Sequence, residues 1–175
     1  MPTRARAGAP ATHTGNVIRD SALGQVPETV DEIIALNGQV WQNSLVSPTL
    51  LEMVRLRNAR AVNCVFCKAV RYEVARNDGL TEERAQLIDA NYAQSALSKR
   101  EKLAIALADC YLGYPAGVKP ELAAQLAAEF TPAQISSLLV ALMTFNFTSR
   151  TAVSIGGMPE DPLPVMLLPI TVTTA

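Results

Sequence analysis

Apolar and polar residues follow one another along most of this chain with the spacing of amphipathic helices. From about residue 28, apolar side chains recur at every third or fourth position, and runs with a period of two are nearly absent before residue 158. This pattern predicts an all-α fold of about seven helices joined by short loops, as in a compact helical bundle. The expected helices cover residues 28–42, 48–62, 64–78, 81–93, 98–112, 120–129 and 132–151.

Several of these helices carry start signals that are legible in the sequence. Ser47 precedes a proline and Thr81 precedes two glutamates, and both residues are good N-caps. Ser98 and Thr131 are each followed three residues later by a glutamate or glutamine, which is the pattern of a capping box. These signals fix where the helices begin.

The two ends of the chain differ in composition from the body. Residues 1–20 are rich in Ala, Thr, Gly and Pro and are expected to form a flexible arm. Residues 158–175 carry four prolines around an apolar run, so they are expected to lie extended against the body or a neighbouring subunit. The predicted helical domain therefore covers residues 21–157.

The composition narrows the class of protein. The chain has 175 residues, 49% of them hydrophobic, and its 15 basic and 16 acidic residues leave a net charge of −1. A basic excess, which nucleic-acid binding through phosphates would need, is absent. No stretch approaches the roughly 20 apolar residues of a membrane span, and no apolar region follows the N-terminal arginines. We therefore expect a cytoplasmic protein without a membrane or nucleic-acid partner.

Candidate chemistry centres on the cysteines, because the one histidine, His13, lies in the arm. Cys64 and Cys67 form a C-x-x-C, and a third cysteine, Cys110, is expected to be a small core residue. Asn63 is expected to cap a new helix, which would place both thiols at the positive end of its dipole and favour the thiolate. A spacing of three also lets a disulfide close, and Arg71 would fall on the face of Cys67.

Other readings of the C-x-x-C stay open at this point. It could be half of a zinc site, although only Cys110 and His13 could complete the four ligands. A thioredoxin-like motif would need a βαβ setting, and no strand pattern precedes Cys64. The two cysteines could also be purely structural.

Three further polar residues are candidates. Glu52 lies in a helix that also carries Arg55 and Arg57, so a solvated ion pair and a functional role are both open. Asn146 and Arg150 continue the apolar stripe of the last helix, where they would line a pocket or an interface or simply reach solvent.

The order Glu52, eleven residues, Cys64-x-x-Cys67 in a helical chain of this length resembles the alkylhydroperoxidase D and carboxymuconolactone decarboxylase-like superfamily. The resemblance runs from about residue 28 to residue 157. It implies that Cys67 attacks a peroxide, that Cys64 resolves the sulfenic acid as a disulfide and that Glu52 belongs to a proton relay. It also implies a trimer or hexamer, and a thiol or protein as reductant.

The sequence departs from that family at two positions. Arg71 stands where the relay histidine is expected, and Phe66 occupies a position that is sometimes also histidine. An arginine stays protonated, so it can hold a thiolate or an anionic substrate but cannot shuttle protons.

The leading hypothesis is thus a thiol–disulfide oxidoreductase that reduces hydroperoxides, with Cys67 as nucleophile, Cys64 as resolving thiol, Glu52 as base and Arg71 as clamp. The alternatives are a lyase for a small carboxylate that Arg71 or Arg150 would bind, and a non-catalytic member of the fold. Phosphate-loop, flavin, nicotinamide and metal-cluster motifs are absent, so no cofactor or metal is expected.

Overall fold

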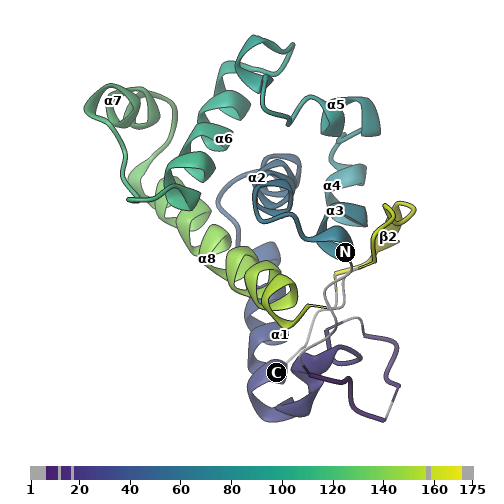
Figure 1. Ribbon diagram of the computed structural model, residues 1–175. Coiled ribbons are helices and arrows are strands. Elements are labelled where there is room, and N and C mark those ends of the chain that lie inside the picture. The colour runs from purple at the N-terminus through teal and green to yellow at the C-terminus, as the bar shows by residue number, and fades with distance from the viewer. Residues whose placement is uncertain (1–6, 12, 17, 157–158, 171–175) are drawn as a thin grey trace.

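The computed structural model is an all-α bundle built around one central helix (Figure 1). It describes residues 7–11, 13–16, 18–156 and 159–170, so parts of the predicted arm and tail lie outside the described residues. The described part holds eight α-helices, two 3-10 turns and one pair of short strands. In chain order these are η1 (Ala22–Gln25), α1 (Pro27–Gln42), α2 (Pro48–Ala61), α3 (Val65–Ala69), β1 (Val70–Tyr72), α4 (Glu73–Asn77), α5 (Glu82–Gln86), η2 (Tyr92–Gln94), α6 (Lys99–Leu112), α7 (Pro120–Glu129), α8 (Pro132–Ile155) and β2 (Met166–Leu168).

Helix α2 lies at the centre of the molecule. In Figure 1 it is seen nearly end-on, with α6 and α8 on one side and α3, α4 and α5 on the other, and α7 lies outside α6. Leu51, Met53, Val54 and Leu56 are completely buried, and apolar side chains of α6 and α8 complete the core around them. Because α2 is buried along most of its length, its buried polar residues must find partners inside the protein.

The predicted caps are confirmed. Ser47, Thr81, Ser98 and Thr131 each accept a backbone N–H in the first turn of their helix, and the last two belong to complete capping boxes. Each cap satisfies one of the backbone donors that a helix start leaves free.

Asn63 ends helix α2 and does not begin the next helix, which corrects the sequence-based expectation. Its φ of 57° is in the left-handed region, and the N–H groups of Asn63 and Cys64 bond back to the carbonyls of Arg60 and Ala59. This is a Schellman ending, for which asparagine is the best choice after glycine. Cys64 is the N-cap of α3, and its sulfur accepts the N–H of Cys67.

The prediction of a single helix over residues 64–78 is wrong. Helix α3 ends at Ala69, and the chain runs extended through β1 before α4 begins. Arg55 of α2 donates to the carbonyl oxygens of Cys67 and Val70, at 2.7 and 2.6 Å. In a continuous helix those carbonyls would bond to backbone N–H groups one turn later. A buried side chain from another helix thus takes over the backbone acceptors at the break.

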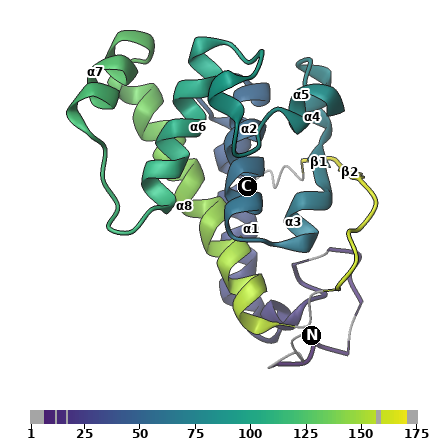
Figure 2. The ribbon, with the colours of Figure 1, turned by 45° about the horizontal axis from the view of Figure 1, so that its top comes forward.

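The extended tail is confirmed in the part that the structure describes. Strand β2 pairs with β1 in parallel, with Val70 opposite Met166 and Tyr72 opposite Leu168. In Figure 2 the two strands lie side by side at the edge of the bundle next to α3 and α4. The tail therefore supplies the partner that the extended break in the helix needs.

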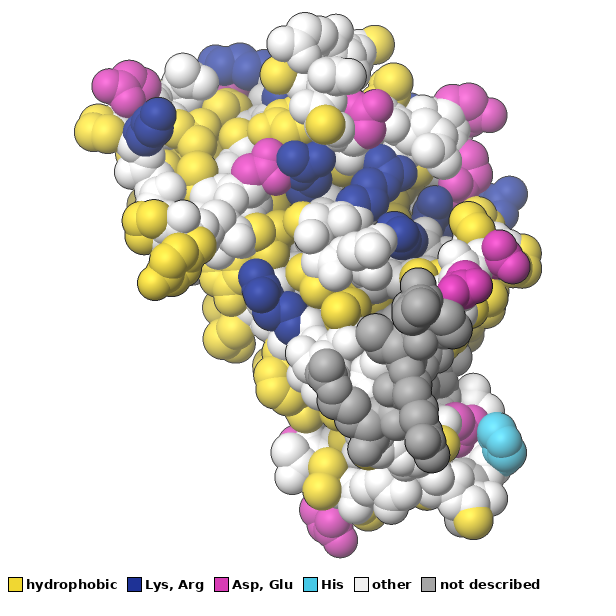
Figure 3. All heavy atoms as spheres, viewed as in Figure 1, with side chains coloured by type: hydrophobic (Ala, Val, Ile, Leu, Met, Phe, Trp, Pro, Cys, Tyr) yellow, Lys and Arg dark blue, Asp and Glu magenta, His cyan; other side chains and the backbone are white. Residues whose placement is uncertain are grey.

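Helix α8 is longer than expected and reaches Ile155. By length and composition alone it could cross a membrane, which the sequence pattern did not indicate. One side of α8 packs on α1, α2 and α6, as a core helix does, while Leu139, Val140, Met143 and Phe147 face outward. Figure 3 shows apolar side chains gathered along the side where α8 runs.

We expect substitution of Asn63 to separate its backbone role from its side-chain role. Asn63→Gly should leave the free energy of unfolding nearly unchanged, because glycine adopts a positive φ without strain. Asn63→Val should lower it by about 1–2 kcal/mol, because a β-branched residue is strained there. Denaturant titration of both variants measures this, and equal stabilities would contradict the assignment.

Glu52 and Arg55 form an ion pair inside the bundle, with Arg55 donating to both carboxylate oxygens at 2.7 Å. Glu52→Gln should lower the free energy of unfolding by about 3–5 kcal/mol, because it leaves the guanidinium charge buried without a counterion. Lys99→Met, which breaks the more exposed Lys99–Glu129 pair, should cost less than about 1 kcal/mol. Similar losses in the two variants would show that the buried pair is not the stronger constraint.

Candidate functional site

Cys64 and Cys67 are joined by a disulfide, with their Cα atoms 5.2 Å apart. The two sulfurs have different surroundings. Cys64 is completely buried at the start of α3, whereas Cys67 is half-buried and lines a cavity. A small molecule in that cavity would therefore meet the sulfur of Cys67 and not that of Cys64.

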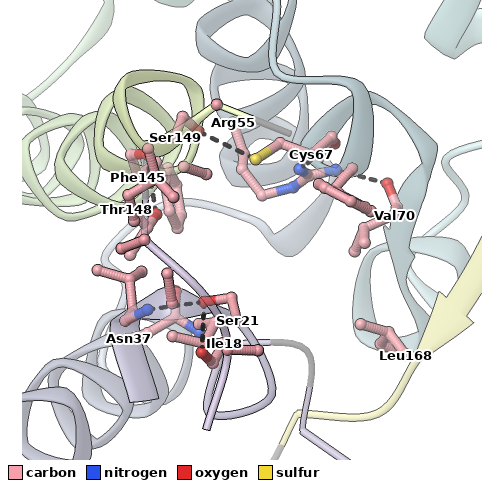
Figure 4. Close-up of a pocket in the computed structure, with 18 of the residues that line it drawn as sticks. Ile18, Ser21, Asn37, Arg55, Cys67, Val70, Phe145, Thr148, Ser149 and Leu168 are labelled. Atoms are coloured by element: carbon pink, nitrogen blue, oxygen red, sulfur yellow. Dashed lines mark hydrogen bonds between the residues drawn. The ribbon is translucent and has the colours of Figure 1, made fainter. Parts of the chain in front are cut away.

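The cavity has a volume of about 310 Å³ and a mostly apolar lining. Figure 4 shows Cys67 and Val70 on one wall, Phe145, Thr148 and Ser149 of α8 on a second, and Ile18, Ser21 and Asn37 on a third. Arg55 is the only charged residue among the described residues of the lining. The site is thus suited to an uncharged molecule with apolar groups.

The arm forms one wall of this cavity, through residues that include Ala7, Ala9 and Ile18. Asp20 holds the arm's turn by accepting the backbone N–H and the hydroxyl of Thr14 and the N–H of Gly15. The backbone bond from Thr14, then its hydroxyl, lower the pKa of Asp20 to about 2. The described part of the arm is therefore a structured wall that its own hydrogen bonds hold in place.

Arg55 and Glu52 form the buried electrostatic element of the site. Burial acts to lower the pKa of Arg55, but the charge and hydrogen bonds of Glu52 outweigh it and raise that pKa above its ordinary value. Four hydrogen bonds occupy the guanidinium: two to Glu52 and two to the carbonyls of Cys67 and Val70. Of the two readings left open for Glu52, the solvated ion pair is excluded, because both side chains are buried.

Tyr72 borders the same ion pair. The centroid of its ring lies 5.6 Å from Cζ of Arg55 and 4.6 Å from the ring centroid of Trp41. Burial raises the pKa of Tyr72, partly offset by Arg55 and by a hydrogen bond with Asn37. The phenol is therefore neutral at physiological pH.

Arg71 does not reach the cysteines, which corrects its expected position on the face of Cys67. Because α3 ends at Ala69, Arg71 lies in β1, and its guanidinium bonds to both oxygens of Glu82 at 2.9 and 3.0 Å. It also donates to the carbonyl of Lys68. Arg71 lines a second, polar cavity of about 350 Å³ between α2, β1 and α5, which Glu52 and Tyr72 border as well.

Hydrogen bonds connect Asn146 and Arg150 to Cys67 through two residues, Asn58 and Ser149, that the sequence pattern did not single out. Ser149 donates its hydroxyl to the sulfur of Cys67 at 3.3 Å, and Asn58 of α2 donates to Ser149 at 3.1 Å. Asn146 bonds to Asn58, and Arg150 bonds to Asn146. Asn58, Asn146 and Ser149 are neutral residues. Arg150 is the charged residue of the four, and it is exposed.

A signal for the missed residues does exist in the sequence. Glu52, Arg55 and Asn58 recur at every third position of a helix that is otherwise nearly all apolar on its buried sides. Ser149 continues the buried stripe of Leu138, Leu142 and Phe145 at helical spacing. A polar residue on such a stripe needs a buried partner, which here is another polar residue.

The third cysteine, Cys110, lies outside the disulfide. Cys110 has a free thiol and is half-buried on α6, whereas a small core residue was expected there. Within the described residues, no group of three His, Cys, Asp or Glu side chains could hold a metal ion. The chemistry available at the cavity is that of a dithiol beside neutral hydrogen-bond donors.

Comparison with known proteins supports this architecture. Two relatives from Mycobacterium tuberculosis, both uncharacterized proteins from different strains, are 30% identical over 112 residues, or 64% of this chain. That match covers only 39% of the relatives' own length, so this chain corresponds to about two fifths of each of them.

Two solved structures share the fold. One is a protein of unknown function from Agrobacterium tumefaciens, named as a candidate antioxidant defence protein AhpD. It is 22% identical with a TM-score of 0.66, covering 75% of this chain and 90% of that one. The other is the debrominase Bmp8, as a cysteine-to-alanine variant in complex with 2,3,4-tribromopyrrole. It is 14% identical with a TM-score of 0.67, covering 81% of this chain and 76% of that one.

A family model matches residues 27–110, from the first turn of α1 to Cys110 in α6, and this segment contains Glu52, Cys64 and Cys67. The residues of α8 that border the cavity lie outside it. The model is that of the carboxymuconolactone decarboxylase family, to which residues 27–110 of this chain are therefore similar.

Proposed function

We propose that this protein is a thiol–disulfide oxidoreductase that reduces hydroperoxides, with Cys67 as the nucleophile and Cys64 as the resolving thiol. The observation that carries the proposal is the asymmetry of the disulfide. The sulfur of Cys67 borders an apolar cavity, whereas Cys64 is buried behind it and close enough to form a disulfide with it. A nucleophile that substrate can reach and a shielded partner thiol are what a two-cysteine peroxidase needs.

The reaction starts from the reduced pair. The Cys67 thiolate attacks one peroxide oxygen, an S–O bond forms, the O–O bond breaks, and the alcohol leaves with a proton from water. Cys67 is then a sulfenic acid. The Cys64 thiol loses its proton, and its sulfur attacks the sulfur of Cys67. Hydroxide leaves, takes up a proton and departs as water, and the disulfide forms. The peroxide gains two electrons, and the two thiols supply them.

The cycle needs an external reductant. We propose a dithiol, either a small molecule or a protein, that attacks the disulfide at Cys67, because this is the sulfur that borders open space. A disulfide that is reduced in every cycle suits a reducing compartment such as the cytoplasm.

The charge of the cavity favours an uncharged hydroperoxide over a carboxylate. Arg55 is the charged residue of the described lining, and Glu52 and two backbone carbonyls already occupy it. Arg71 is paired with Glu82, and Arg150 lies on the surface next to Asn146. Within the described residues, neither Arg71 nor Arg150 lines the cavity that Cys67 borders, so this cavity supports the peroxidase better than the lyase alternative.

We also propose that the protein works as an oligomer of identical chains. The outward side of α8 carries Leu139, Val140, Met143 and Phe147, each more than a third exposed. Burial of such a side against a second copy would remove apolar surface from water.

Single-cysteine variants test the proposed roles. With dithiothreitol as reductant and cumene hydroperoxide as substrate, Cys67→Ser should lose at least about 99% of the turnover, because the nucleophile is gone. Pre-reduced Cys64→Ser, freed of dithiothreitol before the peroxide is added, should consume one peroxide per chain and stop, with a sulfenic acid at Cys67 that dimedone traps. Cys110→Ser is the matched control and should keep its turnover. Undiminished turnover in Cys67→Ser would contradict the proposal.

A further inference from the structure

A row of four hydrogen bonds connects the surface of α8 to the sulfur of Cys67. Arg150 donates its Nε–H to Oδ1 of Asn146 at 2.9 Å, and Asn146 donates from Nδ2 to Oδ1 of Asn58 at 2.8 Å. Asn58 donates from Nδ2 to Oγ of Ser149 at 3.1 Å, and Ser149 reaches the sulfur of Cys67 at 3.3 Å. Figure 4 shows the last of these bonds, between α8 and α3.

All four donors point the same way along this row. Each amide accepts at its oxygen from the surface side and donates from its nitrogen toward the interior. Because the oxygen of Ser149 accepts from Asn58, its hydroxyl hydrogen is free to point at the sulfur. Hydrogen bonds arranged head to tail polarise one another, and the first donor here is a permanent cation.

We propose that Arg150, Asn146, Asn58 and Ser149 form a polarised hydrogen-bond chain that holds the reduced sulfur of Cys67 as a thiolate. Ser149 is the residue that touches the reacting atom, and the other three are positioning residues that orient and strengthen its bond. This role rests on the proposed function, because a peroxide is attacked by a thiolate. It also gives Asn146 and Arg150 a task other than binding substrate.

Burial makes the inner bonds of this hydrogen-bond chain stronger than the same bonds would be in water. Asn58 is completely buried and Ser149 is 3% exposed, so water does not compete for the two inner bonds. Arg150 is exposed, which keeps its charge hydrated and avoids the cost of burying it.

The other charged groups near Cys67 form their hydrogen bonds with partners other than its sulfur. On α2, Arg55 is neutralised by Glu52 and contacts the carbonyl of Cys67 rather than its sulfur. Next to Cys67 on α3, the ammonium of Lys68 bonds to the side chain of Asn63.

The remaining walls add no free charge. On β1, Arg71 is paired with Glu82, and the phenol of Tyr72 is neutral. The described lining residues of the arm, α1 and β2 are uncharged, and Cys64 is the partner thiol itself. The bond from Ser149 is therefore the direct side-chain contact through which the protein acts on the sulfur of Cys67, apart from the disulfide.

The test is the pKa of the Cys67 thiol in the fully reduced chain. It is measured from the pH dependence of iodoacetamide alkylation, with each cysteine resolved by mass spectrometry. Ser149→Ala should raise the pKa of Cys67 by about one unit, since a hydrogen bond to a charged group is lost. Ser149→Thr keeps the hydroxyl and should stay near the wild-type value.

Substitution of Arg150, at the surface end of the hydrogen-bond chain, is a cleaner test, because replacing an exposed side chain does not disturb the core. Arg150→Met should raise the pKa of Cys67 by about 0.3 units, as the outer cation no longer polarises the row. Lys119→Met, which removes one positive charge at the start of α7, is the matched control and should cause no shift.

The outcomes separate this inference from the proposed function. The proposed hydrogen-bond chain would be overturned if Ser149→Ala left the pKa of Cys67 unchanged. It would also be overturned if this pKa were the same in Arg150→Met and Lys119→Met. Because alkylation needs no peroxide, the pKa shifts remain readable if the protein has no turnover. If the pKa of Cys67 shifts as expected but the protein has no turnover, the proposed peroxidase function is overturned and the hydrogen-bond chain is supported.

Discussion

The buried ion pair between Glu52 and Arg55 is the interaction on which the rest of the site depends. A guanidinium inside a bundle needs a counterion and acceptors for its remaining hydrogens, and Arg55 finds them in Glu52 and in the carbonyls of Cys67 and Val70. Those carbonyls belong to the segment that carries the C-x-x-C. The pair therefore fixes where α3 ends and where β1 begins, and with them the direction of the sulfur of Cys67.

Electrostatic neutrality at the cavity follows from the same arrangement. Since the charge of Arg55 is balanced within the core, the cavity presents a mostly apolar surface and the sulfur of Cys67. The hydroxyl of Ser149 is then the polar group in contact with that sulfur. In the proposed function, selection of an uncharged substrate and control of the thiol thus come from different elements, α2 and α8.

The helical bundle was predictable because its signals are local. The caps at Ser98 and Thr131 and the helix over 120–129 are set by neighbouring residues in the chain, and the structure has them where the pattern placed them. The break after Ala69 was not predictable in this way. It depends on Arg55, more than ten residues earlier, and on the tail strand β2, almost a hundred residues later.

The candidate site divides along the same line. Glu52, Cys64 and Cys67 could be picked out by residue type and spacing, and the structure places them in one region. Arg71 was misplaced because its expected face presumed an unbroken helix. Asn58 and Ser149 were missed because serine and asparagine are common, and only the packing of α2 against α8 gives them a partner.

The order in which the three thiols are oxidised shows whether Cys64 and Cys67 act as a peroxide-reducing pair. The fully reduced chain is mixed with one equivalent of cumene hydroperoxide, and the three thiols are followed in time by site-resolved mass spectrometry. We expect Cys64 and Cys67 to be lost together as one disulfide, while Cys110 remains a thiol. Oxidation no faster than that of a free cysteine, or oxidation that begins at Cys110, would contradict this expectation.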